Sequence, residues 1–554
     1  MGLFGLGKDG GKAPKGASPA KGMENKFGSN ANLSALGGGA LGAQAEPTID
    51  NTDMLANKVR RGPYKFMSKI IATLGPKSRD VPILEQLLMS GMNVARFNFS
   101  HGSHEYHQET LDNLRQACKN TGMPCGALLD TKGPEIRTGM LEDGKPVQLV
   151  LGSIITMTTD YTVHGNANLI ACSYPNLPRD VSPGKVILCA DGSITLEVIS
   201  CDPKAGTIQV KCLNDATLGE RKNMNLPGIV VDLPTITEKD KDDLLNWGVK
   251  NNVDFVAASF VRKGSDVDHI RSVLGAKGKN IQIISKVENQ EGLDNFAQIV
   301  EASDGVMVAR GDLGMEIPME KIFIAQKRMI ALCNQAGKFV ITATQMLESM
   351  VQNPRPTRAE ATDVANAVLD GTDCVMLSGE TAAGAHPVDA VRIMGMICQE
   401  AEQFAEYETY FRALVNAQPF PMDTMESLAS SAVRAAQKTD ASCMIVLSKT
   451  GRTARLLAKY RPNIPILTVI MPDDDGHNIE DCERIARQSM CVRGLIPVVA
   501  TSVHTGSGKN KASMDDAIAR ARKMGLCKDG DRVVGVHKIE EDAVIKIIPV
   551  AAHH

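Results

Sequence analysis

Short apolar segments alternate with amphipathic helical patterns through most of this 554-residue chain. A short apolar run bounded by polar residues is typical of a buried strand, and apolar residues every three or four positions are typical of a helix. Eight strands are predicted, at Met67–Leu74, Met92–Phe97, Gly126–Asp130, Asp254–Phe260, Ile281–Val287, Gly305–Ala309, Phe339–Ala343 and Asp373–Leu377. Helical patterns between them include Val81–Met89, Glu105–Lys119, Glu238–Lys250, Ser265–Leu274 and Pro387–Phe404. Eight strand–helix units predict an α/β protein with a closed parallel (β/α)8 barrel of the TIM type.

One connection is too long for a crossover, because residues 131–253 separate the third predicted strand from the fourth. Within it Val147–Thr158 alternates in polarity and Asp191-Gly192 marks a turn, a pattern typical of β structure. A small β domain at 134–233 is therefore expected to interrupt the barrel. The flanking segments, 66–133 and 234–402, together hold 237 residues, close to the roughly 250 of a typical barrel.

The two ends of the chain differ from the barrel. Residues 403–554 again alternate helices and strands and finish on two adjacent strands, which predicts an open α/β domain closed by an antiparallel hairpin. Residues 1–65 are rich in Gly, Ala, Ser and Lys without periodicity, and are expected to form a flexible extension. A plastid targeting segment is the alternative interpretation, although no Arg precedes Arg60.

Charge and cysteine usage exclude several classes of protein. The net charge of −3 argues against a nucleic-acid-binding protein, and no run of 18 apolar residues predicts a membrane span. The thirteen cysteines are scattered, with no Cys-x-x-Cys pair, so they are interpreted as reduced thiols. A cytoplasmic protein is expected.

Charged and hydroxyl residues follow six of the predicted strands, at the end of the barrel where catalytic residues are found. Glu288 and Asp312 suit a hard divalent cation, and Arg96, Lys286 and Arg137 suit phosphate oxygens. The segment Arg310–Gly314 is predicted to open a short helix whose amides face an anion. Together these features predict phosphoryl transfer, which depends on positioning and charge neutralisation.

Six segments resemble those of the pyruvate kinases, in order, spacing and domain plan, from about residue 66 to 550. They are Met92–Gly102, Leu129–Gly139, Ile284–Gly292, Val308–Glu316, Ala343–Met350 and Met376–Thr381. The resemblance implies an enzyme that transfers the phosphoryl group of phosphoenolpyruvate to ADP, giving pyruvate and ATP. It implies that the inserted domain is a β-barrel lid, that the cofactors are Mg²⁺ (or Mn²⁺) and K⁺, and that the assembly is a homotetramer.

The resemblance also implies roles for individual residues. Lys286 would stabilise the enolate, Arg96 would bind the phosphate, and Gly311, Asp312 and Thr344 would receive the substrate carboxylate. Glu288 and Asp312 would hold Mg²⁺; the implied K⁺ ligands are Asn98, Ser100, Asp130 and Thr131. The implied nucleotide contacts are Asn98, His101, Arg137 and Lys222. Ser378 and Glu380 would lie near the path of the proton that completes pyruvate.

Two segments indicate how the enzyme is regulated and how it uses K⁺. Ser448–Thr453 matches the position where many pyruvate kinases bind fructose 1,6-bisphosphate, but the connection His537–Asp542 is short and carries three acids. Like charge repels a bisphosphate, and this departure resembles the plant cytosolic type. Members of the family that dispense with K⁺ tend to carry Lys at the position of Glu135, so dependence on K⁺ is predicted.

Three alternatives remain at this point. His101, His104 and His107 have a spacing that suggests zinc, but positions six apart on a helix diverge and no further Cys or carboxylate is evident, so His104 and His107 are interpreted as solvated. A catalytically silent paralogue would be expected to lack at least one of Lys286, Glu288, Asp312 or Thr344, and all are present. A metal-dependent aldolase barrel would need neither the lid nor the K⁺ ligands.

Overall fold

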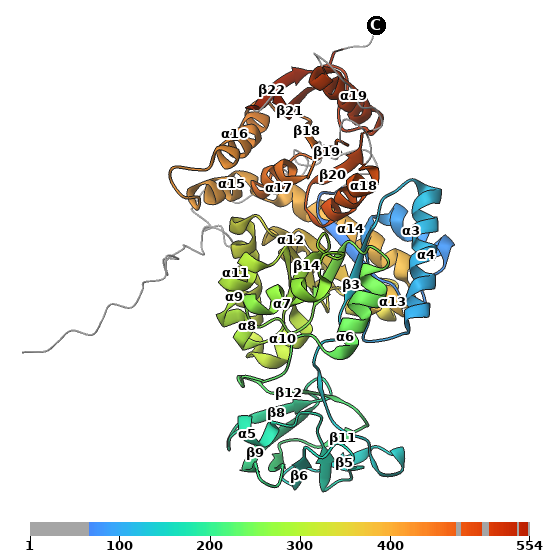
Figure 1. Ribbon diagram of the computed structural model, residues 1–554, viewed down its shortest axis with the longest axis vertical. Helices are drawn as coiled ribbons and strands as arrows, with labels where there is room; N and C mark the ends of the chain where they lie inside the picture. The colour runs from blue at the N-terminus through green and yellow to red at the C-terminus, as the bar shows by residue number, and fades with distance from the viewer. Residues whose placement is uncertain (1–65, 473–477, 501–508, 540–541, 552–554) are drawn as a thin grey trace, which may run out of the picture.

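The computed structural model describes residues 66–472, 478–500, 509–539 and 542–551. Three units follow one another along the long axis of the molecule, with the barrel in the middle (Figure 1). The expected extension at 1–65 lies outside the described residues. The boundary expected at 402/403 falls in the last turn of helix α14 (Pro387–Phe404), which runs from the barrel toward the C-terminal unit.

The central unit is a closed barrel of eight parallel strands, as the sequence predicts. Its order around the barrel is β1-β17-β16-β15-β14-β13-β3-β2. The strands are β1 (Lys69–Thr73), β2 (Met92–Asn98), β3 (Gly126–Asp130), β13 (Phe255–Ala258), β14 (Gln282–Val287), β15 (Gly305–Ala309), β16 (Phe339–Ala343) and β17 (Cys374–Leu377). Most of their residues are buried, because one face lines the barrel and the other packs on helices.

Helices surround the barrel, and the longer ones bury an apolar stripe, as in α3 (Val81–Ser90), where Leu84, Leu87 and Leu88 face the core. The others are α4 (His104–Thr121), α6 (Glu238–Asp242), α7 (Gly264–Leu274), α8 (Gln290–Asp294), α9 (Phe296–Ala302), α10 (Arg310–Glu316), α11 (Ile322–Ala336), α12 (Arg358–Leu369) and α13 (Gly379–Ala382). The helix expected over Glu238–Lys250 is divided, since Asp243–Val249 forms a π-helix that buries Trp247. Capping boxes at Thr237 and Thr357 fix where α6 and α12 begin.

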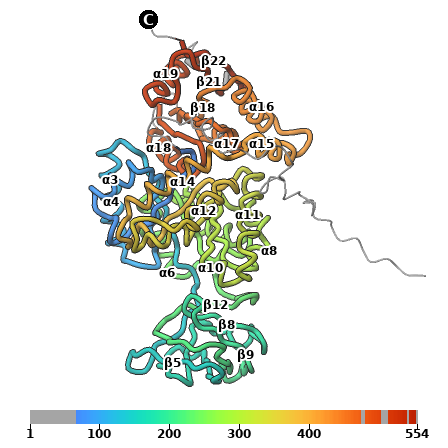
Figure 2. The backbone as a smooth tube through the Cα atoms, turned by 180° about the vertical axis from the view of Figure 1, so that it is seen from behind, coloured from blue at the N-terminus to red at the C-terminus, as the bar shows by residue number. Residues whose placement is uncertain are grey.

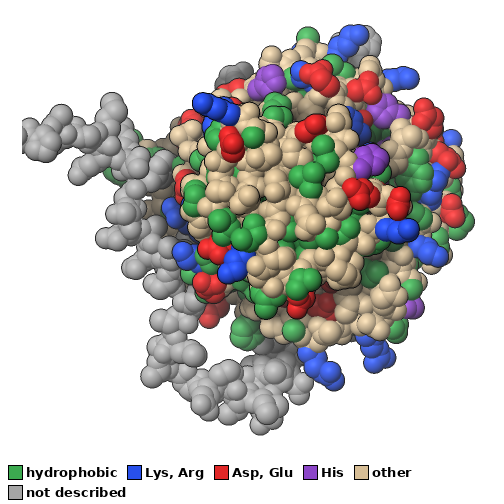
Figure 3. Space-filling model, turned by 90° about the horizontal axis from the view of Figure 1, so that it is seen from below, with side chains coloured by type: hydrophobic (Ala, Val, Ile, Leu, Met, Phe, Trp, Pro, Cys, Tyr) green, Lys and Arg blue, Asp and Glu red, His purple; other side chains and the backbone are tan. Residues whose placement is uncertain are grey.

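The inserted unit is all β around its own apolar core, apart from two short helical segments (Glu142–Gly144 and Leu177–Asp180). Its main sheet has the order β4-β12-β8-β9-β10-β6-β7, beside a pair β11-β5. An isolated antiparallel bridge, Thr138 to Cys172, joins the residues that directly follow the two edge strands β4 and β7. The strands are β4 (Ile136–Arg137), β5 (Val147–Leu149), β6 (Ile154–Thr158), β7 (Leu169–Ala171), β8 (Val186–Cys189), β9 (Ile194–Asp202), β10 (Thr207–Cys212), β11 (Ala216–Leu218) and β12 (Asn223–Asn225). Acidic and basic side chains are interspersed on the face seen from below (Figure 3), in keeping with the small net charge.

The C-terminal unit lies at the opposite end of the barrel from the inserted unit (Figure 2). Its five-stranded sheet has the order β20-β19-β18-β21-β22, and only β22 is antiparallel to its neighbour. The elements are α15 (Tyr407–Asn416), α16 (Thr424–Lys438), β18 (Cys443–Ser448), α17 (Arg452–Lys459), β19 (Ile466–Ile470), α18 (Ile479–Gln488), β20 (Leu495–Val499), α19 (Lys509–Lys523), β21 (Arg532–Ile539) and β22 (Asp542–Pro549).

Two ion pairs, one buried and one partly buried, join this C-terminal unit to the ends of the barrel strands that face it. Arg461 contacts Asp373 at 2.9 Å, and Arg487 contacts Asp254 at 3.0 Å. Among the described helices, none combines the length and apolar character that crossing a membrane requires.

Candidate active site

Lys286 occupies the centre of the barrel rim that faces the inserted domain. It is 9 % exposed, and its Nζ donates to Ser259 Oγ at 2.8 Å. The same atom lies 3.2 Å from Asp130 Oδ1 and 2.9 Å from Glu288 Oε1. Burial disfavours the charged form, but the carboxylates of Asp130, Glu288 and Asp312 raise the pKa of Lys286 above its ordinary value. A buried, permanently charged ammonium is therefore held at the rim.

Arg96, at the end of β2, provides a second cation beside Lys286. Its Nε donates to Asp130 Oδ2 at 2.6 Å, and its Nη1 donates to Thr73 Oγ1 at 2.9 Å. Burial favours the neutral form of Asp130, but Arg96 and Lys286 lower the pKa of this carboxyl below its ordinary value. One ionised carboxylate thus positions two cations, an arrangement suited to phosphate oxygens.

Glu288 combines a hydrogen-bonded oxygen with an unsatisfied one. Oε2 accepts from the backbone amide of Phe260 at 2.5 Å, whereas Oε1 accepts no hydrogen bond of acceptable geometry within the described residues. Burial raises the pKa of Glu288 to about 7, with Lys286 opposing the shift and Asp312 adding to it. A buried carboxylate oxygen without a hydrogen bond fits the needs of a metal ligand.

Gly311 and Thr344 meet where β15 and β16 end. The Gly311 amide donates to Thr344 Oγ1 at 2.7 Å, and Thr344 has a left-handed backbone with φ 68°. Arg310 supports this turn, since its guanidinium donates to the Thr344 carbonyl at 2.7 Å and pairs with Asp363 at 2.7 Å. Gly311 and Thr344, two of the residues expected to receive the substrate carboxylate, therefore lie together. In this conformation the Gly311 amide donates to Thr344 itself.

The residues expected to bind K⁺ lie at the ends of two neighbouring strands, where Asn98 pairs in register with Asp130. Asn98 Oδ1 accepts from the Ser100 amide at 3.1 Å, and Thr131 Oγ1 accepts from the Ser259 amide at 3.1 Å. Asp130 Oδ1 accepts no well-formed hydrogen bond from a described residue. This oxygen, which lies 3.2 Å from Lys286 Nζ, and its hydroxyl and amide neighbours are hard donors that a monovalent cation can share.

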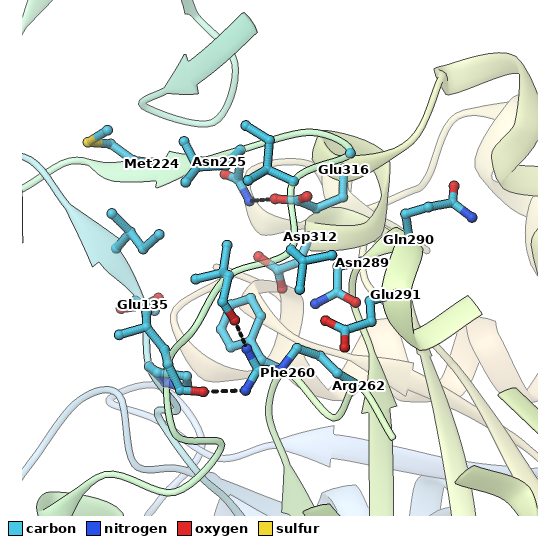
Figure 4. Close-up of a pocket in the computed structure, with 18 of the residues that line it drawn as sticks. Glu135, Met224, Asn225, Phe260, Arg262, Asn289, Gln290, Glu291, Asp312 and Glu316 are labelled. Carbon is cyan, nitrogen blue, oxygen red and sulfur yellow. Dashed lines mark hydrogen bonds between the residues drawn. The ribbon is translucent and has the colours of Figure 1, made fainter. Parts of the chain in front are cut away.

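A cavity of about 200 Å³ lies between the rim and the segments that lead into and out of the inserted domain (Figure 4). Asp312 and Glu316 line it from α10, and Asn225 reaches across from β12 to donate to Glu316 Oε1 at 3.0 Å. Arg262, from the barrel, donates to two backbone carbonyls of the returning segment, those of Val231 and Leu233. The opening of the active site is thus walled partly by the inserted domain.

Arg137 and Lys222, the two basic residues expected to contact nucleotide, lie at the edge of the inserted domain. Arg137 Nε donates to Glu135 Oε2 at 2.9 Å, and its Nη1 donates to the Arg221 carbonyl at 2.8 Å. Lys222 is exposed, as is His101 on the rim. The Arg137 side chain is therefore engaged with an acid in this conformation, whereas Lys222 and His101 face solvent.

Glu380 and Ser378 are held at the end of β17. Glu380 is fully buried, and its two oxygens accept from the amides of Leu347 at 3.1 Å and Ser378 at 2.6 Å. Both oxygens of this carboxylate are therefore satisfied by backbone amides. In this position Glu380 ties the segment after β16 to the segment after β17.

The interpretation of the histidines was wrong in two respects. His107 is buried, stacks on Phe99 with ring centroids 4.2 Å apart, and bonds to the His101 carbonyl at 2.8 Å. Carboxylates do lie near His104, because Asp243 Oδ1 is 2.8 Å from its Nε2 and Asp242 is close by. Lys239 Nζ lies 2.5 Å from Asp243, so this carboxylate forms an ion pair with Lys239.

Sequence reasoning missed several residues that support the site. Ser259 and Thr73 follow or end the fourth and first strands, whose ends were not considered, and each contacts a central cation. Their position at strand ends was a usable signal. Arg262 and Arg310 donate hydrogen bonds to backbone carbonyls of residues far away in the sequence. The sequence alone held no signal for these contacts.

Comparison with known proteins agrees with this architecture. Residues 66–391 match the family model for the pyruvate kinase barrel domain, and residues 426–547 match the pyruvate kinase alpha/beta domain. The chain is 60 % identical to a cytosolic pyruvate kinase isozyme of Solanum tuberosum over 486 residues, which cover 87 % of this chain and 95 % of that one. A cytosolic isozyme of Glycine max is 58 % identical with the same coverage.

A solved structure is also similar. The crystal structure of a pyruvate kinase from Cryptosporidium parvum superposes with a TM-score of 0.82 at 46 % identity, covering 88 % of this chain and 96 % of that chain. The match extends over barrel and C-terminal units alike. The chain therefore belongs to the pyruvate kinase family, the enzymes that transfer the phosphoryl group of phosphoenolpyruvate to ADP in the last step of glycolysis.

Proposed function

We propose that Lys286 and Arg96, with the carboxylates Glu288 and Asp312, form the phosphoryl-transfer centre of this pyruvate kinase. The observation that carries the proposal is the buried Lys286 ammonium, 2.9 Å from Glu288 and bridged to Arg96 by Asp130. Two fixed cations in a water-poor rim can stabilise an anion without reorganising during the reaction.

The proposed reaction moves one phosphoryl group between two oxygens. A terminal phosphate oxygen of ADP attacks the phosphorus of phosphoenolpyruvate, and the bond from phosphorus to the enol oxygen breaks. The electron pair of that bond stays on the enol oxygen, where Lys286 stabilises the enolate. Carbon 3 then takes up a proton and pyruvate forms. Thr344 and Gly311 orient the substrate carboxylate.

Ser378 and Glu380 are proposed to shape the region of the proton path. Because both Glu380 oxygens accept from backbone amides, its proposed task is to position the segment that follows Thr344. Ser378 lies beside Glu380, and we propose that its hydroxyl group is part of the proton path.

The described residues fit the expected cations. Glu288, with its unsatisfied Oε1, and Asp312 would hold Mg²⁺ or Mn²⁺, and Asp130 with Asn98, Ser100 and Thr131 would hold K⁺. Bound cations supply positive charge that neutralises the oxygens of the substrate. Lys286 and Arg96 provide the remaining neutralising charge from the chain itself.

For the nucleotide, we propose contacts from Asn98, His101, Arg137 and Lys222, with the inserted domain closing over the site as a lid. Arg137 pairs with Glu135 in the present conformation. When ADP binds, Arg137 would therefore leave the carboxylate of Glu135 and pair with a phosphate of ADP. Its positive charge would be compensated in both states.

A cytoplasmic homotetramer is the proposed setting. The support for location is the similarity to cytosolic isozymes at 58–60 % identity. Expression of the full chain with a C-terminal fluorescent tag tests location, since import into plastids would show the alternative. Sedimentation velocity tests the assembly.

A coupled assay for pyruvate tests the activity. Purified protein is given phosphoenolpyruvate with Mg²⁺ and K⁺, in the presence and absence of ADP. Pyruvate formed only with ADP, with one ATP per pyruvate, is the expected result. No turnover would identify a catalytically silent paralogue. Formation of pyruvate without ADP, or formation or cleavage of a carbon–carbon bond, would identify a different barrel enzyme.

A further inference from the structure

A second cavity, of about 240 Å³, lies between the barrel and the C-terminal domain, at the opposite end of the barrel from the active site. Its barrel side is formed where strands begin: Gln282 starts β14, Phe339 starts β16, and Asp373 directly precedes β17. Its other side is formed mainly by helix α17. This end of such a barrel usually serves stability rather than chemistry, so a polar cavity here calls for a separate explanation.

Basic side chains dominate the lining of this cavity. They are Lys338, Arg452, Arg455, Lys459 and Arg461, against the carboxylates of Asp304 and Asp373. Asp373 is fully used by Arg461, at 2.9 and 3.0 Å. Asp304 pairs with Arg271 at 2.9 Å, outside the cavity lining, and Lys459 pairs with Glu426 at 2.6 Å. The acids are thus already neutralised by other cations.

Three of the cations remain without a salt bridge to any described residue: Lys338, Arg452 and Arg455. Lys338 Nζ donates to the Ser303 carbonyl at 2.6 Å, and Arg455 Nη1 reaches the Thr450 carbonyl at 3.4 Å. Carbonyl oxygens satisfy these donors without cancelling their charge, and the carboxylate of Asp304, which also lines the cavity, offsets the charges of Lys338 and Arg455 only in part.

The three cations also crowd one another. Burial lowers the pKa of Arg455, with Asp304 opposing and Arg452 reinforcing the shift. Burial likewise lowers the pKa of Lys338, and the charge of Arg455 contributes in the same direction. A bound anion would relieve this mutual repulsion.

We propose that this cavity binds a small phosphate monoester between the barrel and the C-terminal domain. Two guanidinium groups and an ammonium match the oxygens and the charge of a phosphate dianion. The apolar side chains of Leu456 and Val492 offer a surface to a short carbon skeleton. The volume is below the roughly 300–1,000 Å³ of sites for drug-sized ligands, which favours a ligand with about three carbons.

This site overlaps the Ser448–Thr453 segment considered in the sequence at Arg452, which lines the cavity, but it differs from that segment in its other cations. Lys338 comes from the barrel, and Arg455 lies within α17 beyond that segment. The two sites can therefore be separated by mutation. Lys449 belongs to the segment but does not line the cavity, and Lys338 and Arg455 line the cavity but do not belong to the segment.

Hydrogen–deuterium exchange of the full-length enzyme tests the proposal, with glycerol 3-phosphate as the probe at up to millimolar concentration. Glycerol at matched ionic strength serves as the uncharged control. We expect slower exchange in residues 334–339 and 452–461 with glycerol 3-phosphate and none with glycerol. Arg455→Gln and Lys338→Gln should each raise the half-saturating concentration roughly tenfold or more, because each removes a charged hydrogen-bond donor. Lys449→Gln should leave it unchanged.

The opposite results would overturn the proposal. These are protection confined to the active-site rim or to residues 448–451, equal protection by glycerol, or unchanged half-saturation in both cavity variants. Arg455→Lys keeps the positive charge but loses the paired N–H donors of the guanidinium group. Its half-saturating concentration should lie between those of the wild type and Arg455→Gln. If Arg455→Gln does not fold, Arg455→Lys and Lys338→Gln provide the same comparison.

Discussion

Lys286 and Glu288 lie two residues apart at the end of β14, and the ammonium of Lys286 is 2.9 Å from Oε1 of Glu288. Both side chains are nearly inaccessible, at 9 % and 1 % exposure. The cation expected to stabilise the enolate and a carboxylate expected to hold the metal are thus in direct contact. A change in either residue must alter the charge that the other experiences.

The first prediction concerns Lys286. Lys286→Met should lower kcat by at least ~10²–10³, the usual loss for one preorganised donor, because its ammonium faces the charge that develops on the enol oxygen. KM for phosphoenolpyruvate should change much less, since the interaction strengthens in the transition state. Steady-state kinetics measure both quantities, with Lys185→Met on the inserted domain as the matched control. Near wild-type kcat in Lys286→Met would remove this residue from catalysis.

The second prediction concerns the divalent metal. Glu288→Gln and Asp312→Asn keep the shape of each side chain but remove a negative charge, so both should raise the Mg²⁺ concentration needed for half-maximal activity. Glu316→Gln is the control, because Glu316 lines the same cavity as Asp312 but accepts a hydrogen bond from Asn225. Identical Mg²⁺ titration curves for all three variants would place the ligands elsewhere.

The third prediction concerns K⁺. We expect the unmutated enzyme to be much faster in K⁺ than in tetramethylammonium at equal ionic strength, and Glu135→Lys to relax this dependence by supplying an ammonium charge. Glu135 also pairs with Arg137. Glu135→Gln therefore separates loss of that pair from gain of charge, and it should stay K⁺-dependent. Equal rates of the unmutated enzyme in both salts would contradict the hypothesis.

The fourth prediction concerns fructose 1,6-bisphosphate, which should give little or no activation. β21 and β22 pair as far as Ile539 and Asp542, which leaves only Glu540 and Glu541 to connect them; these two lie outside the described residues. The like charge of Glu540, Glu541 and Asp542 is expected to oppose binding of a bisphosphate. Phosphoenolpyruvate saturation curves with and without micromolar bisphosphate check this, and a clear shift to lower concentrations would refute it.

The fifth prediction concerns pH and the buried Lys69, whose Nζ donates to the Leu495 carbonyl at 2.7 Å. Burial lowers the pKa of Lys69 from 10.5 to about 8. Between these values the unfolded chain holds a proton that the folded chain has released, so the free energy of unfolding rises with pH in this window. The full penalty applies below pH 8, and a shift of this size corresponds to about 3 kcal/mol.

Lys69→Met should raise the free energy of unfolding by removing this penalty. The hydrogen bond to the Leu495 carbonyl is lost in the variant, which reduces the gain by about 1 kcal/mol. The variant should therefore be the more thermostable protein at pH 7, and its advantage should shrink as pH approaches 10.5. Differential scanning calorimetry of both proteins from pH 7 to 10 measures the change in Tm. A constant difference across this range would show that Lys69 keeps its proton in the folded protein up to pH 10, and would contradict the lowered pKa.

The order of the strands and the identity of the central residues could be predicted from the sequence. Buried strands carry apolar runs, and a parallel barrel brings the residues that follow its strands to one rim. Arg96, Lys286, Glu288 and Asp312 were therefore recognisable before any contact was known. The same logic applied to the first and fourth strands would have added Thr73 and Ser259.

Contacts between residues far apart in the sequence were decided only by the tertiary structure. The approach of Asp243 to His104 and the hydrogen bond of Lys286 to Ser259 leave no periodic pattern in the chain. The cavity between the barrel and the C-terminal domain likewise brings together Lys338 and Arg455, which belong to different domains. Sequence periodicity reports which face of an element is buried, because burial follows from local spacing. It does not report which polar groups meet across elements, because that depends on how the packed elements are placed relative to one another.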